Sequence, residues 1–172
     1  MKTIIFYKTN TGFTKEYVEL LKPRIQCEEA YPIGKISNKL IKNADNIVFL
    51  GPLRNNVIQG LNKLLKKYNK IEQKNIFIFG VGIEPVSDTK KENVIMSNGL
   101  ELYHVRLYLI QGGFDLNRYK GIKKVFIKSI IKIASKKQPE MGMIENRSIN
   151  FVSGNNLDKM VDVFYKVNKD NY

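Results

Sequence analysis

Thr3-Ile4-Ile5-Phe6-Tyr7 is followed directly by Lys8-Thr9-Asn10-Thr11-Gly12-Phe13-Thr14 near the start of this 172-residue sequence. The first run is rich in β-branched and aromatic residues, which is typical of a buried strand. The second run is a polar loop, and helical apolar spacing follows it from Thr14 to Lys22, before Pro23. This strand, loop and helix order predicts the first unit of an α/β fold.

The same alternation continues along the chain. Apolar runs predict further strands at Gln26–Ala30, Asn46–Leu50, Asn75–Val81 and Val105–Ile110. Helical spacing predicts helices at Val57–Tyr68, about Lys90–Tyr103 and about Asn155–Val167. Continuous apolar runs indicate strands buried on both faces, and intervening helices imply right-handed parallel crossovers. We therefore predict one domain over residues 1–172, a doubly wound α/β sheet of five parallel strands with helices on both faces.

Ligands of such sheets bind at the carboxyl ends of the strands, so the loops 8–14, 51–57 and 82–89 are the candidate sites. The first loop is neither a Walker A loop nor a Gly-x-Gly-x-x-Gly dinucleotide loop. It offers three Thr hydroxyls, an Asn amide and backbone N–H groups at a helix N-terminus, and this set suits a phosphate. The alternative is that Asn10 or Thr11 is only a helix N-cap.

Thr9-x-Thr11-Gly12-x-Thr14, directly after the Ile-Ile-Phe-Tyr strand, resembles the FMN-phosphate loop of flavodoxins. Gly51-Pro52 resembles the start of the flavodoxin loop that packs against one face of the flavin. The resemblance implies the flavodoxin strand order 2-1-3-4-5, FMN as cofactor and electron transfer as the chemistry. The flavin itself would carry the redox step, so no side chain is expected to be catalytic.

The resemblance also implies which residues hold FMN. The phosphate would be bound by Thr9, Asn10, Thr11, Gly12 and Thr14, with Phe13 covering the loop. One ring face would be lined by Pro52, Leu53, Arg54 and Asn55, and the other by Gly82, Ile83 and Glu84.

A narrower resemblance rests on the segment Gly112 to Tyr119 and the basic stretch that follows it to Lys137. This arrangement is similar to that of flavodoxin-domain proteins akin to the menaquinone-dependent protoporphyrinogen dehydrogenase. It implies a basic amphipathic helical insertion at about residues 117–140, and a redox partner or a quinone- or porphyrin-like substrate.

The flavin-facing loops depart from the flavodoxin pattern, because residues 54–57 and 82–86 contain no Phe, Tyr or Trp. A flavin there would lose aromatic stacking worth about 0.5–1.5 kcal/mol per pair. The alternative function is therefore a flavodoxin-fold binding or scaffold module that has lost flavin. A second hypothesis concerns Arg54, whose charge would stabilise the anionic reduced flavin; the alternative is a solvated loop residue.

The chain is basic, with 29 Lys and Arg against 16 Asp and Glu and a net charge of +13, which favours an anionic partner. The stretch 120–137 holds seven Lys and no acid, and its apolar residues cover a wide helical arc. Such a helix can lie on an anionic membrane; the alternative is a docked helix with a solvated lysine face. No nucleic-acid-binding signature is present, so we do not expect nucleic acid as the partner.

Single copies of Cys and His exclude an internal disulfide and a multi-Cys or His-rich metal site. Cys27 and His104 have no partner implied by the sequence, so both are expected to be structural. The first apolar run is too short for a signal peptide, and no run approaches the roughly 18 residues of a spanning helix. The expected location is the cytoplasm, with the basic stretch as a peripheral contact to the inner face of the membrane.

Overall fold

The computed structural model describes residues 1–119, 121–122, 124–125, 127–128 and 148–169. Its main sheet has the parallel order β2-β1-β3-β5-β6, with the short β4 paired antiparallel to the end of β3. When β4 is left aside, this is the predicted order 2-1-3-4-5. The parallel strands are β1 (Thr3–Tyr7), β2 (Ala30–Pro32), β3 (Asn46–Arg54), β5 (Asn75–Gly82) and β6 (Arg106–Gln111).

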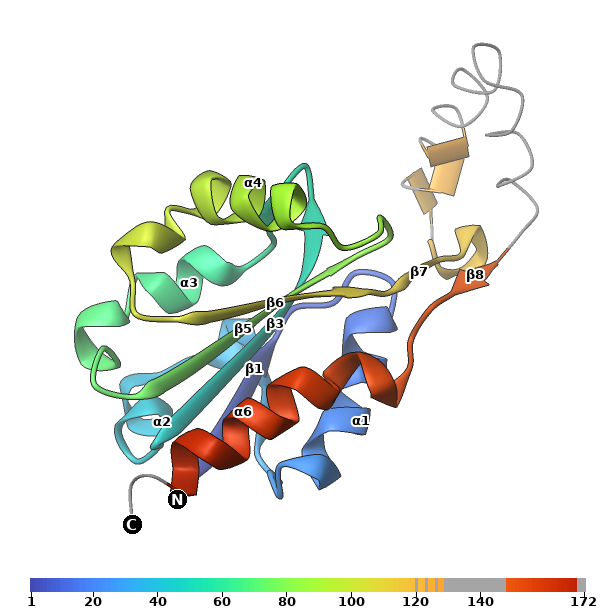
Figure 1. Ribbon diagram of the computed structural model, residues 1–172. Coiled ribbons are helices and arrows are strands. Elements are labelled where there is room, and N and C mark those ends of the chain that lie inside the picture. Colours follow the sequence, from blue (N-terminus) through green and yellow to red (C-terminus); the bar gives the residue numbers. More distant parts are fainter. Residues whose placement is uncertain (120, 123, 126, 129–147, 170–172) are drawn as a thin grey trace.

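Helices cover both faces of the sheet, as the sequence predicts (Figure 1). One face carries α1 (Phe13–Arg24) and α6 (Asp158–Lys169), and the other carries α2 (Asn38–Lys42), α3 (Leu61–Leu65) and α4 (Asp88–Asn98). Short 3₁₀ helices join several of them: η1 (Ile33–Lys35), η2 (Tyr68–Lys70), η3 (Leu100–Leu102), η4 (Leu116–Arg118) and η6 (Gly154–Leu157).

Two apolar cores lie on opposite faces of the sheet because side chains alternate along each strand. In β3, Phe49 faces the core under α3 and α4, whereas Val48 and Leu50 face the core under α1 and α6. All three side chains are fully buried. The continuous apolar runs therefore do indicate a doubly covered sheet.

The predicted second strand, Gln26–Ala30, is wrong in its position. Gln26 has a left-handed φ of 51°, and the Cys27 N–H donates to the Lys22 carbonyl at 2.9 Å, so the first part of this segment ends α1. Pairing with β1 begins only at Glu29, whose carbonyl accepts from the Ile5 N–H. The buried Cys27 packs in the core below α1, as a structural residue should. The strand forms three residues later, with Ile5 opposite Ala30.

The predicted helix Val57–Tyr68 is also wrong over its first four residues, and α3 ends earlier than predicted, at Leu65. Val57 and Ile58 form β4, which pairs with Arg54 and Leu53 through a tight turn. Asn55 and Asn56 both have positive φ, 48° and 63°, as a two-residue hairpin turn of primed type requires. The helix α3 begins only at Leu61, after Gly60.

Other boundaries shift by a few residues. Helix α1 continues through Pro23 to Arg24, and β3 continues past Gly51 to Arg54. The predicted helix 90–103 begins earlier and divides into α4 and η3 at Gly99, whose φ is 60°. The last helix starts at Asp158, because residues 154–157 form η6.

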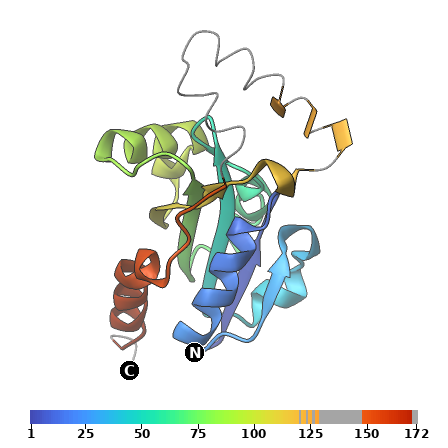
Figure 2. The ribbon, with the colours of Figure 1, turned by 90° about the vertical axis from the view of Figure 1, so that its right-hand side faces the viewer.

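A small two-stranded sheet that the sequence analysis did not predict follows β6. Strand β7 (Gly113–Phe114) pairs antiparallel with β8 (Ile149–Asn150), so the chain leaves the sheet and returns at the same place (Figures 1 and 2). The residues described at 121–122, 124–125 and 127–128 are helical. The rest of the predicted 117–140 insertion and of the 120–137 basic helix lies outside the described residues, so that prediction is untested beyond them.

Candidate functional site at the carboxyl ends of the strands

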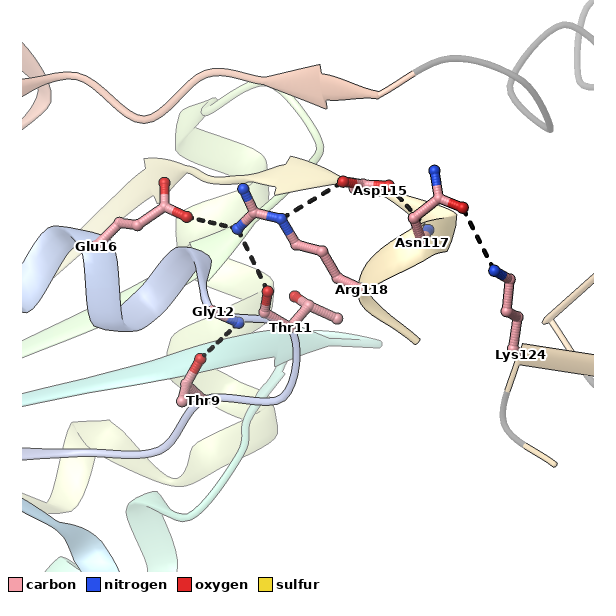
Figure 3. Close-up of polar contacts among 8 residues, drawn as sticks. All are labelled: Thr9, Thr11, Gly12, Glu16, Asp115, Asn117, Arg118 and Lys124. Carbon is pink, nitrogen blue, oxygen red and sulfur yellow. Dashed lines mark hydrogen bonds and ion pairs between the residues drawn. The ribbon is translucent and has the colours of Figure 1, made fainter. Parts of the chain in front are cut away.

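The loop after β1 leads into an uncapped helix. Gly12 is the N-cap of α1, no side chain caps this helix, and the interpretation of Asn10 or Thr11 as the cap is therefore wrong. The Gly12 N–H instead donates to Thr9 Oγ1 at 3.0 Å, which holds the turn (Figure 3). Gly12 has a φ of 97°, a conformation that residues with a Cβ avoid. The first-turn N–H groups of α1 and the positive end of its dipole remain for an anion.

An arginine distant in sequence lies on this loop. The Arg118 Nη1 atom is 2.5 Å from Glu16 Oε1 and donates to the Thr11 carbonyl at 3.4 Å, and its Nε is 3.5 Å from Asp115 Oδ2 (Figure 3). Its guanidinium also lies 4.0 Å from the centroid of the Phe13 ring. Arg118 thus ties η4 to the phosphate loop through charge, a hydrogen bond and ring stacking.

The sequence analysis expects Phe13 to cover the loop, but its side chain is only 3% exposed and packs beneath the loop. A Cβ on Gly113 would lie 2.6 Å from Phe13 Cε1 and 2.4 Å from the Ile149 carbonyl oxygen. Only glycine therefore fits where β7 crosses Phe13. Thr14 is equally buried, so the exposed part of the loop comes from Thr9, Asn10 and Thr11.

The predicted ring-facing residues of β3 divide into two pairs. Pro52 and Leu53 are half-buried, and Pro52 lies in register with Val81 of β5. Arg54 and Asn55 are exposed at the tip of the β3–β4 hairpin. A tight turn, instead of an open loop, therefore presents the Arg54 charge to solvent.

The residues after β5 lie beside this hairpin. A Cβ on Gly82 would be 3.4 Å from Leu53 Cδ2, so these two predicted site residues are neighbours. Ile83 is 42% exposed and accepts a hydrogen bond at its carbonyl from Gln111 Nε2 at 3.3 Å. Glu84 is exposed and forms an ion pair with Lys90, which reduces its negative charge toward a ligand.

Aromatic side chains do reach this end of the sheet, although from a different segment than expected. The rings of Phe114 and Tyr119 lie 6.1 Å apart. Burial raises the pKa of Tyr119, and the nearby positive charge of Arg54 opposes that rise. Tyr119 is thus half-buried, neutral at physiological pH and close to a predicted ring-facing residue.

The sequence analysis missed Arg118, Glu16 and Tyr119 as site residues. The segment Gly112 to Tyr119 stood out as a motif, but nothing in its spacing shows that η4 folds back onto the loop after β1. The available signal was the pair of consecutive glycines Gly112-Gly113, which indicates that another part of the chain approaches this backbone closely. Within the described part of the chain, no group of three or more His, Cys, Asp or Glu could bind a metal ion.

The family model of the flavodoxin domain matches residues 4–140 of the sequence. The chain belongs to the flavodoxin domain family. The match includes the loop after β1, the β3–β4 hairpin and the segment with Arg118 and Tyr119. Membership of this family supports FMN as the cofactor of the flavodoxin domain and a flavin-dependent redox role.

One solved structure with a TM-score above 0.5 agrees on the fold of this flavodoxin domain. A flavodoxin, WrbA-like protein from Agrobacterium tumefaciens is similar with a TM-score of 0.51 and 16% identity, over 64% of this chain and 83% of that one. A Fusobacterium nucleatum flavodoxin bound to flavin mononucleotide has a TM-score of 0.42 and 19% identity, over 67% and 72% of the two chains. No curated protein sequence matches the chain. None of the described helices has the length and hydrophobicity needed to cross a bilayer.

Proposed function

We propose that the chain is an FMN-dependent electron-transfer domain that binds the cofactor phosphate at the N-terminus of α1. The observation that carries the proposal is the uncapped N-terminus behind Gly12, at the carboxyl end of β1, in a flavodoxin-family chain. Free N–H donors, a helix dipole and the Arg118 guanidinium, 2.5 Å from Glu16, surround one small loop. This donor set suits a phosphate dianion better than any neutral group.

The backbone N–H groups of the loop would be the main phosphate ligands, with the hydroxyl of Thr11 beside them. Thr9 has a different part, because its Oγ1 already accepts from Gly12 and so shapes the turn. The Thr14 side chain is buried and would contribute its N–H alone. Arg118 would neutralise the Glu16 and Asp115 carboxylates, so that they do not repel the phosphate.

The flavin ring would lie near Leu53, Arg54 and Asn55 on one side and near Gly82, Ile83 and Glu84 on the other. FMN, when bound, supplies one- and two-electron redox chemistry that no side chain here provides. Leu53 and Ile83 would exclude water from the ring, and Tyr119 would supply the aromatic surface that both loops lack. The Arg54 charge would favour the anionic reduced flavin and so raise its reduction potential.

The finer proposal is a role like that of the protoporphyrinogen dehydrogenases, with a quinone- or porphyrin-like substrate or a separate redox partner. It is supported by the order of the first loop, the Gly112 to Tyr119 segment and the basic stretch after it. In the described part of that stretch, Ile122 is 88% exposed and Val125 66% exposed, next to Lys124 and Lys128. Contact with the inner face of an anionic membrane remains part of this proposal.

Fluorescence quenching with FMN and with riboflavin tests the central proposal. We expect FMN to bind at least tenfold more tightly than riboflavin, since only FMN carries the phosphate. Thr11→Asp should weaken FMN at least tenfold by like-charge repulsion and leave riboflavin within threefold. Asn43→Asp, an equal charge change at an exposed residue after α2, is the control and should change neither.

Two outcomes would contradict the proposal. Equal affinities for FMN and riboflavin would show that the loop does not hold a phosphate. No uptake of either flavin, in a folded protein purified without colour, would favour the scaffold module that has lost flavin.

A further inference from the structure

A cavity of about 900 Å³ lies on the other side of the loop after β1. It is formed where the chain leaves β1, β2 and the β3–β4 hairpin, and where α3 begins. It shares two residues with the proposed FMN site: Thr9, and Lys15, whose backbone N–H belongs to the first turn of α1.

Three lysines line this cavity: Lys8, Lys15 and Lys63. No acidic residue is among its lining residues. Across the described part of the chain, the ion pairs join other bases, so none of these three ammonium groups has a carboxylate partner. Three unneutralised charges around one concave surface create a positive potential that an anion would relieve.

The lysines enter the cavity from three separate elements, which places their charges around it instead of along one line. Lys8 follows β1, Lys15 is in the first turn of α1, and Lys63 is in α3. The Lys8 stem lies against Gly60, since a Cβ on Gly60 would be 3.1 Å from Lys8 Cδ and 3.3 Å from Lys8 Cβ. Gly60 has a φ of 89°, a conformation that residues with a Cβ rarely adopt.

The remaining lining combines apolar and amide groups. Ile33 and Leu61 are buried in the wall, Val57 is 41% exposed, and Gln59 and Asn62 add amide groups. A volume of this size is typical of sites for small organic ligands. A nucleic-acid strand or an acidic protein would need a stripe of cations on an open surface instead.

We propose that this cavity is a second binding site, for a small organic anion with an apolar body and at least two phosphate or carboxylate groups. The lysines pair with its anionic groups, and Ile33, Val57 and Leu61 contact its body. The site is independent of FMN. The proposal does not depend on the proposed function, because the lysines and the cavity exist whether or not flavin binds.

The test is a backbone NMR titration of the full chain, with and without added FMN, using pyrophosphate and citrate as probes. We expect chemical-shift changes at residues 8–9, 33–34 and 59–63 with at least one probe, at the same positions when FMN is present. The stronger probe identifies phosphate or carboxylate as the natural group. The combined variant Lys8→Gln, Lys15→Gln and Lys63→Gln should weaken that probe at least tenfold.

The control removes three charges elsewhere: Lys91→Gln, Lys159→Gln and Lys166→Gln, all exposed and outside the cavity. It should change probe affinity less than threefold. Equal weakening by the two triple variants would overturn the proposal in favour of a diffuse basic surface that attracts any polyanion. Shifts confined to residues 10–14, or probe binding abolished by FMN, would also overturn it, because the probe would then occupy the phosphate loop.

Discussion

The two sides of the loop after β1 use positive charge in opposite ways. On one side Arg118 is held by Glu16, Asp115 and the Thr11 carbonyl, and it stacks on Phe13. On the other side Lys8, Lys15 and Lys63 line a cavity that has no acidic residue in its lining. A cation that is paired with carboxylates has little electrostatic repulsion left and holds the backbone around it in position. Cations without such partners repel one another, so a bound anion lowers their electrostatic free energy most. The difference separates a supporting role from a binding role.

The largest effect is expected from a substitution that disrupts the packing of β7 on Phe13, on the side of the loop where Arg118 is paired. Gly113→Ala would place a methyl group against Phe13 and the Ile149 carbonyl, at 2.6 and 2.4 Å. Because backbone cannot yield as a flexible side chain does, we expect the free energy of unfolding to fall by about 2–4 kcal/mol. Urea denaturation measures the change.

Gly34→Ala is the matched control, since a Cβ there would meet nothing within 4 Å. We expect it to change stability by no more than about 1 kcal/mol, in the stabilising direction. Similar effects of the two substitutions would mean that the packing of β7 on Phe13 is not tight.

The second prediction concerns the hydrogen bonds of the Tyr17 hydroxyl on the Arg118 side of the loop. This buried side chain of α1 donates to the Gln111 carbonyl and accepts from Asn156 Nδ2 at 2.5 Å. It therefore connects α1 to the end of β6 and to η6. Burial raises the pKa of the Tyr17 phenol above its usual value near 10. We expect Tyr17→Phe to lower the free energy of unfolding by about 1–3 kcal/mol at pH 7.

The pH dependence has a definite sign. Between the unfolded and the raised folded pKa, the native state binds more protons than the unfolded state, so stability falls as pH rises. The contribution of the neutral phenol is complete below about pH 10 and is lost above it. Urea unfolding at pH 9 and pH 11 should show a smaller alkaline loss in Tyr17→Phe than in wild type. Tyr165→Phe, at an exposed residue, should retain the full loss.

The third prediction compares how FMN affinity responds when a positive charge is removed from each side of the loop. Arg118→Gln leaves the Glu16 and Asp115 carboxylates without a counter-ion beside the proposed phosphate site, so we expect FMN affinity to fall about tenfold by like-charge repulsion while riboflavin affinity stays within threefold. Lys63→Gln removes an equal charge on the cavity side and should change FMN affinity less than threefold. Fluorescence quenching measures both. Equal losses would mean that the general positive field, and not a positioned guanidinium, attracts the cofactor.

The strands were predictable because their physical signal is local. Runs such as Asn75–Val81 are apolar at every position, and a strand buried on both faces needs nothing else. The second strand was displaced because Gln26 and Cys27 complete the C-terminus of α1, and its own three residues carry no apolar alternation. The apolar spacing from Val57 predicts a helix where Val57 and Ile58 form β4, although Asn55-Asn56 is a turn signal when both residues need positive φ.

The candidate site was predictable only in part for a related reason. Thr9 to Thr14 form one continuous loop, so their order in the sequence is already their order in space. Arg118 and Tyr119 lie about a hundred residues away, and only the turn of the chain through β7 and η4 brings them to that loop. The strand order determines which strand ends lie side by side at the edge of the sheet. It does not determine which later segment of the chain folds over them.

By itself, the sequence determined the alternating α/β pattern, the polar loop before α1 and the excess of positive charge. These depend on residue types and on spacing within single segments. Only the tertiary structure decided how that charge is divided, with Arg118 neutralised against Glu16 and Lys8, Lys15 and Lys63 left to face a cavity. The physical reason is that electrostatic energy depends on distance in space, and residues far apart in the chain acquire that distance only when the sheet and its connections have formed.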